Sequence, residues 1–453
     1  MVLKTKKRLP LTMMSKIVEI FQSRVENCLP KLQHLLVTGD LLHYEKALER
    51  MLIDVSNEMS SVLLTCSALS FLEHYEPPAG SNPEIRPARF RLSTGYRVQL
   101  PSLYLKRIAK DHQGNRNVLL DHWNIQAGNS LALCDKAAYL AMLSPSYEVA
   151  CEALNKLETK ICLSSVRDLT NGLAHQVEQR GEEQMLLESH ETLAGKKVVI
   201  STDGGRSRMR EYRQEVSAKG FGQYDTPWRE PKLFVIEVIG EKGRRKRKEL
   251  PIYGCRFGEE DMVELLERYL SKLQIEKAAH VQLIADGAQW IWKQIPPMLE
   301  RLGVAPSRLT QTIDHYHAKS YLHQLVEKMP KRISHQQRSE YLSTFKDQLW
   351  RGDVKAIVET CRSVFKRPAD LVKRWINYFD KHSDRMQYAD YKDNELLCGS
   401  GLIESAIRRI INLRFKNAST FWSQQIVEKL YALRAAVLSK RWGILIDNIA
   451  KAN

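Results

Sequence analysis

The chain lacks two features that would place it in or across a membrane: a long apolar run and a signal peptide. No stretch of the 453 residues approaches the roughly 18 uninterrupted apolar residues of a membrane span. The start, MVLKTKKRLPLTMMSK, is basic but has neither the apolar stretch nor the cleavage site of a signal peptide. These absences predict a cytoplasmic protein with no membrane partner.

Cysteine pairs are also missing. The chain has 8 cysteines, but none forms a C-x-x-C pair. This scatter disfavours a zinc ribbon and a secreted disulfide framework. We therefore predict reduced, mostly buried thiols and assign no structural metal.

Positive charge, in contrast, is in excess. The formal net charge is +16 and the pI is about 9.4. Clustered Lys and Arg gain affinity for phosphate backbones by releasing condensed counterions. Net charge alone does not separate a nucleic-acid-binding protein from a basic soluble one, so the distribution of the charge matters more. With 43% hydrophobic residues the chain can bury a large core, and its length predicts roughly two to four structural units.

One basic cluster stands between two apolar stretches. In EKGRRKRKEL, six of the seven residues 242–248 are basic, Arg245 and Arg247 among them. Gly240 and Gly243 supply turn chemistry between LFVIEVI and LPIYG, which predicts a β-hairpin with a cationic tip for DNA. A solvated loop is the alternative.

The first part of the chain is predicted to be mainly helical. Apolar residues recur at helical spacing over 12–75, within a predicted N-terminal module of residues 1–80. A Pro- and Gly-rich linker follows, and a small sheet is expected between residues 89 and 120. Further helices are predicted at 129–143, 146–157 and 164–180, within a DNA-end-binding module of residues 89–185. The last two helices fit a helix-turn-helix or, alternatively, a plain helical hairpin.

From Lys196 onward the pattern changes to strands that alternate with helices. The predicted strands are KKVVISTD, LFVIEVI, ELPIYG, HVQLIAD and RLTQTID, with a helix from Glu259 to Leu273 and another through WIWKQIPPMLERL. Three strands before the first helix, then alternation, is the order of a ribonuclease H-like α/β fold. We expect this core in residues 195–320 and 396–453, with an inserted helical domain over 321–395.

Three isolated acids suggest the chemistry. Asp203 and Asp286 each end an apolar strand, and ligands collect at the carboxyl ends of strands in open α/β sheets. Glu404 begins a run whose other charged residues are basic, on a helix that returns to the sheet after the insertion. Three close carboxylates repel one another, so divalent cations are their natural partners.

Each acid also has an ordinary structural interpretation. Asp203 in TDGG and Asp286 in ADGA could be turn residues, as Asp commonly is before Gly, and Asp286 could cap the next helix. Glu404 could pair with Arg408 one turn later. The ordered combination favours a joint role.

The chain resembles the DDE transposases of bacterial insertion sequences, in particular the ISKra-type branch, whose C/D(2)H motif is shared with hAT and Mutator-like transposases. The resemblance covers roughly residues 120–440 and rests on STDGGR with Asp203, IADGAQWIW with Asp286, TIDHYHA with Asp314 and His317, and GSGLIESAIRRIINLRFKN with Glu404, followed by Trp422. Relatives often carry a cysteine-rich ribbon before the helical pair, and RFRLSTGYRVQLPSLYLKRIAKD has no cysteine.

The resemblance implies a metal-dependent nuclease and strand transferase of a bacterial, nucleoid-associated type. Asp203, Asp286 and Glu404 would hold two Mg²⁺ ions, with Mn²⁺ able to substitute. Asp314 and His317 would lie near the active site and position a helix or the DNA. His317 as a general base is the less favoured alternative, because two-metal chemistry does not need one.

The cations around the acids suit a DNA substrate. The residues predicted to contact phosphates, besides those of the 242–248 cluster, are Arg206, Arg208, Arg408, Arg409, Arg414 and Lys416. Trp350 or Trp375 could stack on a flipped base, although core packing is the simpler interpretation. We predict a transposase acting on double-stranded DNA as a homodimer or higher oligomer. The alternatives are a catalytically silent DNA-binding relative and a stand-alone nuclease.

Overall fold

A computed structural model describes residues 11–78, 81–106, 115–216, 222–244, 246, 248–416 and 421–451. The fold divides after Leu173 into two compact units, and residues from Ala450 onward belong with the first. The sequence predicted five segments, whereas the structure divides into two units. No helix among the described residues is long and apolar enough to cross a lipid bilayer.

The first unit begins with two long helices and continues with short strands and helices. Its elements are α1 (Leu11–Val37), α2 (Leu41–Glu73), β1 (Asn82–Ile85), β2 (Ala88–Arg91), β3 (Arg97–Leu100), β4 (Leu103–Lys106), β5 (Arg116–Asn117), α3 (Val118–His122), α4 (Leu131–Leu143), α5 (Tyr147–Lys156) and α6 (Leu163–Arg180), which continues into the second unit. The predicted linker is therefore wrong in part, because β1 lies in it and pairs with β4.

The second unit is a mixed α/β structure. Its strands are β6 (Lys197–Gly204), β7 (Ser207–Arg208), β8 (Glu211–Val216), β9 (Gly222–Asp225), β10 (Trp228–Arg229), β11 (Lys232–Ile239), β12 (Ile252–Arg256), β13 (His280–Ala285) and β14 (Leu309–Ile313). Its helices are α7 (Glu182–Leu186), α8 (Glu259–Lys272), α9 (Gln289–Arg301), α10 (His315–Glu327), α11 (His335–Arg351), α12 (Val354–Val364), α13 (Asp370–His382), α14 (Tyr388–Asp393), α15 (Gly401–Ile407), α16 (Leu413–Phe415), α17 (Gln424–Leu438) and α18 (Trp442–Lys451).

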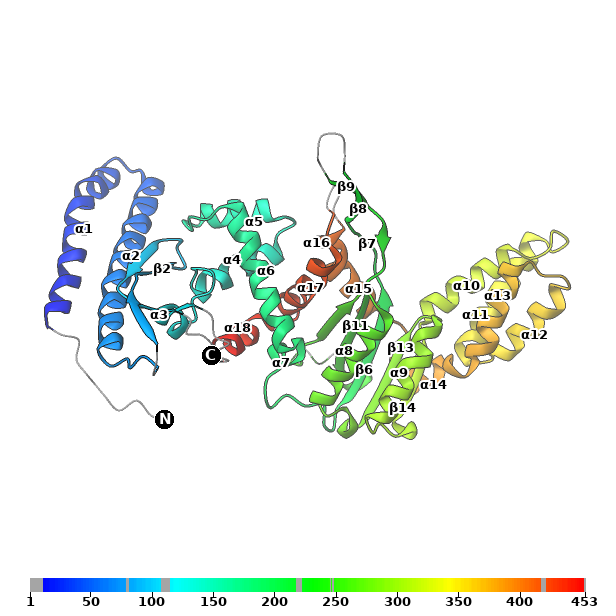
Figure 1. Ribbon diagram of the computed structural model, residues 1–453. Coiled ribbons are helices and arrows are strands. Elements are labelled where there is room, and N and C mark those ends of the chain that lie inside the picture. The colour runs from blue at the N-terminus through cyan, green and yellow to red at the C-terminus, as the bar shows by residue number, and fades with distance from the viewer. Residues whose placement is uncertain are drawn as a thin grey trace. The chain divides into compact units, whose positions relative to one another are not determined.

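Five strands form the main sheet in the order β12-β11-β6-β13-β14 (Figure 1). Strand β11 runs antiparallel to both of its neighbours, whereas β6, β13 and β14 are parallel. These five strands lie where the apolar runs predicted them. The mixed order is compatible with a ribonuclease H-like core.

The helices of the predicted insertion share one apolar core with the sheet. Phe345 of α11, Ile357 of α12 and Trp375 of α13 belong to the same buried cluster as Ile200 of β6 and Leu283 of β13. Burial of apolar area at about 25 cal/mol per Å² stabilises this arrangement. The helices predicted within residues 321–395 are present, and they are anchored to the sheet through this core.

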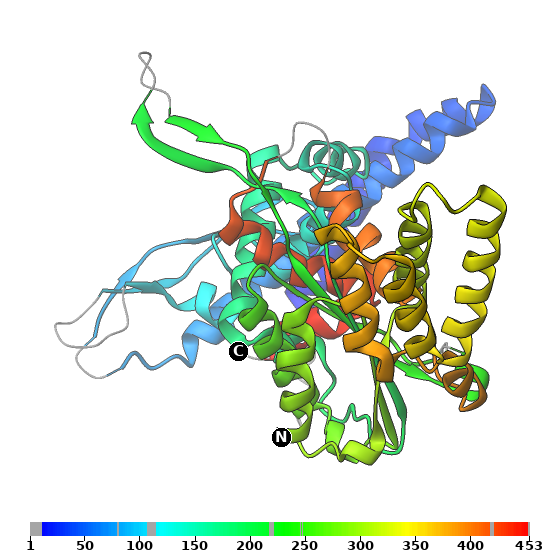
Figure 2. The ribbon, with the colours of Figure 1, turned by 90° about the vertical axis from the view of Figure 1, so that its right-hand side faces the viewer.

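Strands β8 and β9, with the shorter β7 and β10 before and after them, extend beyond the main sheet (Figures 1 and 2). No strand was predicted between residues 205 and 231. All 8 cysteines are free, as expected, but only Cys134, Cys255 and Cys361 are buried, so the prediction of mostly buried thiols is wrong.

Candidate active site

Three acids lie at the carboxyl ends of three neighbouring strands. Thr202 of β6 lies opposite Ala285 of β13, so the next residues, Asp203 and Asp286, are side by side at the carboxyl edge of the sheet. Parallel strands are about 4.8 Å apart, and residues in register point to the same face. Asp314 follows β14, and its N–H donates to the Ala285 carbonyl at 2.9 Å. The strand pattern predicted this meeting of Asp203 and Asp286.

Ionisation of the Asp203 carboxyl group costs free energy in the folded protein. Burial raises its pKa to about 6, and the neighbouring charge of Asp286 adds to the increase. A hydrogen bond from the Gly204 N–H, 2.7 Å long, and the nearby His317 ring act in the opposite direction but do not cancel it. A buried carboxylate beside a second acid attracts a divalent cation, because a cation removes both the repulsion and the desolvation cost.

The pKa of Asp203 gives a testable stability effect in metal-free protein. Because its folded pKa of about 6 exceeds the ordinary 3.8, its stability contribution is complete below pH 3.8 and is lost as the pH rises through 6. Asp203→Asn should therefore increase the free energy of unfolding by about 1–3 kcal/mol at pH 8 in chelator, and by nothing at acid pH. Urea unfolding at both pH values measures this. A variant less stable than wild type at pH 8 would contradict the assignment.

The turn after Asp286 is held from three sides. Its Oδ1 accepts a hydrogen bond from the Ala288 N–H at 2.9 Å, and its carbonyl accepts one from Trp292 Nε1 at 2.8 Å. A Cβ at Gly287 would lie 2.2 Å from Tyr378 Cε2, so only glycine fits there. The Tyr378 hydroxyl is buried and has no hydrogen-bond partner among the described residues. The Asp286 carboxylate is therefore fixed by packing before any ligand arrives.

Asp314 joins the sheet to the helix that carries Glu404. Its side chain accepts the His317 N–H at 2.8 Å as the N-cap of α10 and also accepts the N–H of Ser400, the N-cap residue of α15. Asp314 is 1% exposed, and these donors hold its pKa well below the ordinary value against the effect of burial. Its buried position supports the predicted role in positioning a helix and does not allow contact with DNA.

The segment before α15 is also tied to the sheet. The buried Gln282 of β13 donates to the Leu397 carbonyl at 2.7 Å and accepts the Leu397 N–H at 3.0 Å. The N–H of His315 donates to the Cys398 carbonyl at 3.0 Å. This pairing brings α15 back to the acid edge after the helical insertion.

His317 lies between the acids. Its Nδ1 is 3.4 Å from Asp314 Oδ1, and its side chain is 37% exposed. The contact with Asp314 raises the pKa of the imidazole, and the charges of Asp203 and Asp286 raise it further. A protonated His317 therefore offsets part of the negative charge of these acids.

Glu404 does not join the two aspartates in this structure. It is exposed on α15, a helix that packs against β6 and β11, and its side chain forms no ion pair or hydrogen bond with any described residue. Within the described parts of the chain, no group of three or more His, Cys, Asp or Glu side chains could hold a metal ion. Of the three carboxylates predicted to cluster, Asp203 and Asp286 lie together and Glu404 does not join them.

A different acid lies beside Asp203. A Cβ at Gly204 would lie 2.0 Å from Glu230 Oε1, and the Glu230 charge contributes to the raised pKa of Asp203. Glu230 is 57% exposed in its side chain and pairs with Lys232 at 2.7 Å. Sequence analysis missed it. The signal was its position just before a strand that pairs antiparallel with β6.

The predicted phosphate contacts occupy different environments. Arg206, Arg208, Arg408 and Lys416 are exposed. Arg409 is half-buried, and its guanidinium donates to the Tyr253 hydroxyl at 3.1 Å.

Arg414 is 1% exposed, and its guanidinium lies 5.0 Å from the Trp422 ring centroid. Its prediction as a surface contact is therefore corrected, because apolar helix packing covers it. Arg245 and Arg247 fall outside the described residues.

The described residues of the basic cluster between β11 and β12 are at the opposite end of the sheet from the acids. Strand β11 starts opposite Gly204 and ends opposite Lys197, so the loop after it returns to the amino end of β6. Eight residues at about 3.3 Å each separate the two ends by roughly 25 Å. The predicted β11–β12 hairpin is confirmed, but its tip lies far from the acids.

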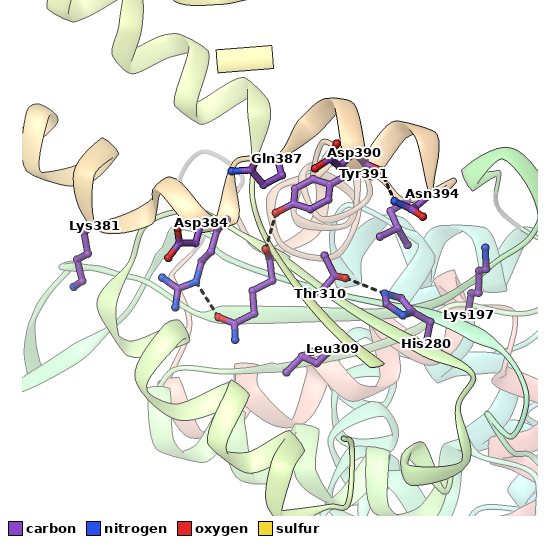
Figure 3. Close-up of a pocket in the computed structure, with 13 residues that line it drawn as sticks. Lys197, His280, Leu309, Thr310, Lys381, Asp384, Gln387, Asp390, Tyr391 and Asn394 are labelled. Carbon is purple, nitrogen blue, oxygen red and sulfur yellow. Dashed lines mark hydrogen bonds between the residues drawn. The ribbon is translucent and has the colours of Figure 1, made fainter. Parts of the chain in front are cut away.

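A cavity of about 730 Å³ lies at this same amino end, lined by the first residues of β6, β13 and β14 and by residues 381–396 (Figure 3). Its polar groups largely satisfy one another. Arg385 donates to Gln311 at 2.8 Å, the Tyr391 hydroxyl to the Gln311 carbonyl at 3.1 Å, and the His280 ring lies 3.0 Å from the Thr310 hydroxyl. The cavity is therefore separate from the acid edge.

No protein-family model matches the chain, and no curated protein matches it. Among solved structures, it is similar to the Drosophila P element transposase strand transfer complex, with 13% sequence identity over 73% of this chain and 84% of that chain and a TM-score of 0.27. A TM-score this low carries no argument about fold or function.

The donor set itself fits a hard divalent cation. Asp203 and Asp286 offer carboxylate oxygens, the ligands that Mg²⁺ prefers, and their charge is only partly compensated. Strand register places the two residues next to each other, so both could contribute oxygens to one ion.

Proposed function

We propose that the chain is a DDE-type DNA transposase with a ribonuclease H-like core. It cleaves phosphodiester bonds at the ends of its own element and joins the 3′-hydroxyl ends to target DNA. The observation that carries this proposal is the pair Asp203 and Asp286, in register on neighbouring parallel strands, with the start of the Glu404 helix fastened to the next strand end through Asp314.

The sheet supports the assignment of the fold. Numbered along the chain, its five strands have the order 3-2-1-4-5, with only the second antiparallel to the first. Along the chain, three of these strands precede α8 and strands then alternate with helices, which is the element order that the sequence predicted for a ribonuclease H-like core, with the helical insertion between the last strand and α15.

We assign the catalytic roles to three acids. Asp203 and Asp286 would hold Mg²⁺, or Mn²⁺ in its place, and Glu404 would supply the third carboxylate. When bound, two such ions activate a water or a 3′-hydroxyl and stabilise the leaving oxygen of an in-line displacement at phosphorus. Burial of Asp203 strengthens its attraction for a cation, and the exposed Arg408, one turn after Glu404, can hold a phosphate beside the acids.

Cleavage of the chain's own element ends tests the proposal. The full chain is incubated with Mg²⁺ and duplex DNA carrying the sequences that flank its gene. We expect nicked ends and joined products, both of which disappear when a chelator removes the metal. Binding without cleavage in Mg²⁺ or Mn²⁺ would favour the catalytically silent DNA-binding alternative. Cleavage of branched DNA of any sequence would favour a stand-alone nuclease.

We extend the proposal to at least a homodimer, because joining two DNA ends requires that both be held together. Helix α1 supports this with Met14, Val18 and Phe21, which recur on one helical face and are 50%, 54% and 49% exposed. Light scattering should give at least twice the 52.3 kDa chain mass, and Phe21→Glu should reduce it to one chain. A wild-type mass of one chain would contradict the dimer.

A further inference from the structure

The feature with no role so far is the two-stranded extension that follows β6, which we call the ribbon: β7 and β8 on one side, β9 and β10 on the other. Arg208 pairs with Trp228 in β7–β10, and Tyr212 pairs with Tyr224 in β8–β9. Both views show β8 and β9 projecting away from the main sheet (Figures 1 and 2). The ribbon starts at Ser207, four residues after Asp203.

The base of the ribbon is firmly anchored. The Arg210 N–H donates to the Trp422 carbonyl at 2.7 Å, so the segment before α17 adds a strand-like contact. The Ser207 hydroxyl lies 3.0 Å from the Tyr431 hydroxyl of α17 in a buried pair. Arg414 lies over the ring of the buried Trp422. Arg414, which was predicted to contact DNA, therefore packs against the Trp422 segment that holds the base of the ribbon.

Three large aromatic side chains of the ribbon are open to solvent. Tyr212 is 66% exposed, Trp228 49% and Tyr224 41%. The Arg208 guanidinium lies 5.2 Å from the Trp228 ring centroid, and Lys416 Nζ lies 5.6 Å from it. Exposure of these rings to water is unfavourable, so a ligand that covers them gains free energy. The cations beside the rings are placed to bind an anionic ligand.

The charge of the ribbon is unbalanced toward positive. Where the structure describes their side chains, the acids at the ribbon are already paired: Glu211 with Arg229, Asp225 with Arg213, and Glu230 with Lys232. In contrast, Arg206, Arg208 and Arg210 have no acidic partner among the described residues. Arginines alternate with the buried Ser207 and Met209, so they lie on one face of the strand.

We propose that the ribbon is a stacking platform for unpaired nucleotides of the DNA next to the cleavage site. Bases would stack on Trp228 and on the Tyr212–Tyr224 pair, and Arg208 and Lys416 would hold adjacent phosphates. Aromatic rings stack on bases whose π-faces are free, whereas the faces of paired bases are covered inside the duplex.

The inference rests on the proposed function for the place of the cut. Arg208 is five residues after Asp203, at most about 18 Å of chain away. A nucleotide on the platform is therefore within a few nucleotides of the acid edge.

Binding in chelator, where no cleavage occurs, tests the platform with the full chain. The probe is a short oligonucleotide carrying 2-aminopurine, used single-stranded and annealed to its complement. We expect the single strand to bind with a change in 2-aminopurine fluorescence. Trp228→Ala should weaken single-strand binding about 5- to 100-fold and remove the fluorescence change, because stacking on one aromatic residue contributes that much. Trp228→Phe should retain most of both, and duplex affinity should change far less.

Trp350→Ala is the matched control, since Trp350 is a comparably exposed tryptophan, 39% against 49%, outside the ribbon. The platform would be overturned if Trp228→Ala bound the single strand as tightly as wild type, or if it lost affinity equally for single strand and duplex. A loss of single-strand affinity in Trp350→Ala alone would overturn it too. A change in oligomer mass with Trp228→Ala, and none in DNA binding, would assign the ribbon to a second copy of the chain. Asp203→Asn should keep the fluorescence change, so failure of cleavage and failure of the platform are distinguishable.

Discussion

Asp203→Asn and Asp286→Asn should each lower the rate of DNA cleavage by roughly 10³-fold or more while DNA binding persists. Asparagine keeps the shape of the side chain but removes the charge that binds a divalent cation. We expect both acids to be needed, because strand register places them side by side at the carboxyl ends of β6 and β13. Rates from gel assays, with affinities measured in chelator, separate cleavage from binding.

The third carboxylate is decided by the same assay. We expect Glu404→Gln to lose cleavage to the same extent as the aspartate variants, and Glu230→Gln to retain it within a few-fold. Glu230 is the matched control, because it is an exposed acid beside Asp203 that already has Lys232 as a partner. The reverse result would assign the third ligand to Glu230 and remove Glu404 from the site.

Asp314→Ala should have the largest effect on stability, lowering the free energy of unfolding by about 3–5 kcal/mol. The change removes a buried charged acceptor and leaves the N–H groups of His317 and Ser400 without it. We also expect slower cleavage, because Asp314 holds the start of α15, which carries Glu404, to the sheet. Asp314→Asn should lie between, since its amide oxygen can still accept one of the two N–H groups.

Asp353→Ala is the control for this prediction. Asp353 occupies the N-cap position of α12 but makes no side-chain capping bond, so its loss should change stability by less than about 0.5 kcal/mol. Because the folded pKa of Asp314 is depressed, its contribution is present above pH 3.8 and is lost as the pH falls below that value. Urea unfolding should therefore show the difference between wild type and Asp314→Ala shrinking below pH 4. Equal stability of the two proteins at pH 7 would show that Asp314 does not anchor α15.

The dependence of stability on Asp203 has the opposite sign to that of Asp314. Near neutral pH, Asp203 destabilises the metal-free fold, whereas Asp314 stabilises it. Residues that lower stability in the absence of a ligand are typical of functional sites, and residues that raise it are typical of supporting structure. Asp203 therefore behaves as a functional residue at this edge of the sheet, and Asp314 as a structural one.

The ribbon shows why part of the site could not be predicted from sequence. Its strands are two to six residues long and carry Arg, Glu and Tyr rather than alternating apolar residues. Such strands form because cross-strand partners and the Trp422 segment hold them, and these contacts are distant in sequence. The burial of Arg414 has the same origin.

The sequence by itself determined the strands and the acids at their ends, because apolar runs followed by Asp-Gly are local signals that each segment carries alone. It also determined the return of a helix at Gly401 after the insertion. Which acids lie together depended on long-range pairing, since strand register places Asp203 and Asp286 side by side and leaves Glu404 exposed on α15. The antiparallel direction of β11 likewise placed the basic cluster at the far end of the sheet, because strand direction is a property of pairing.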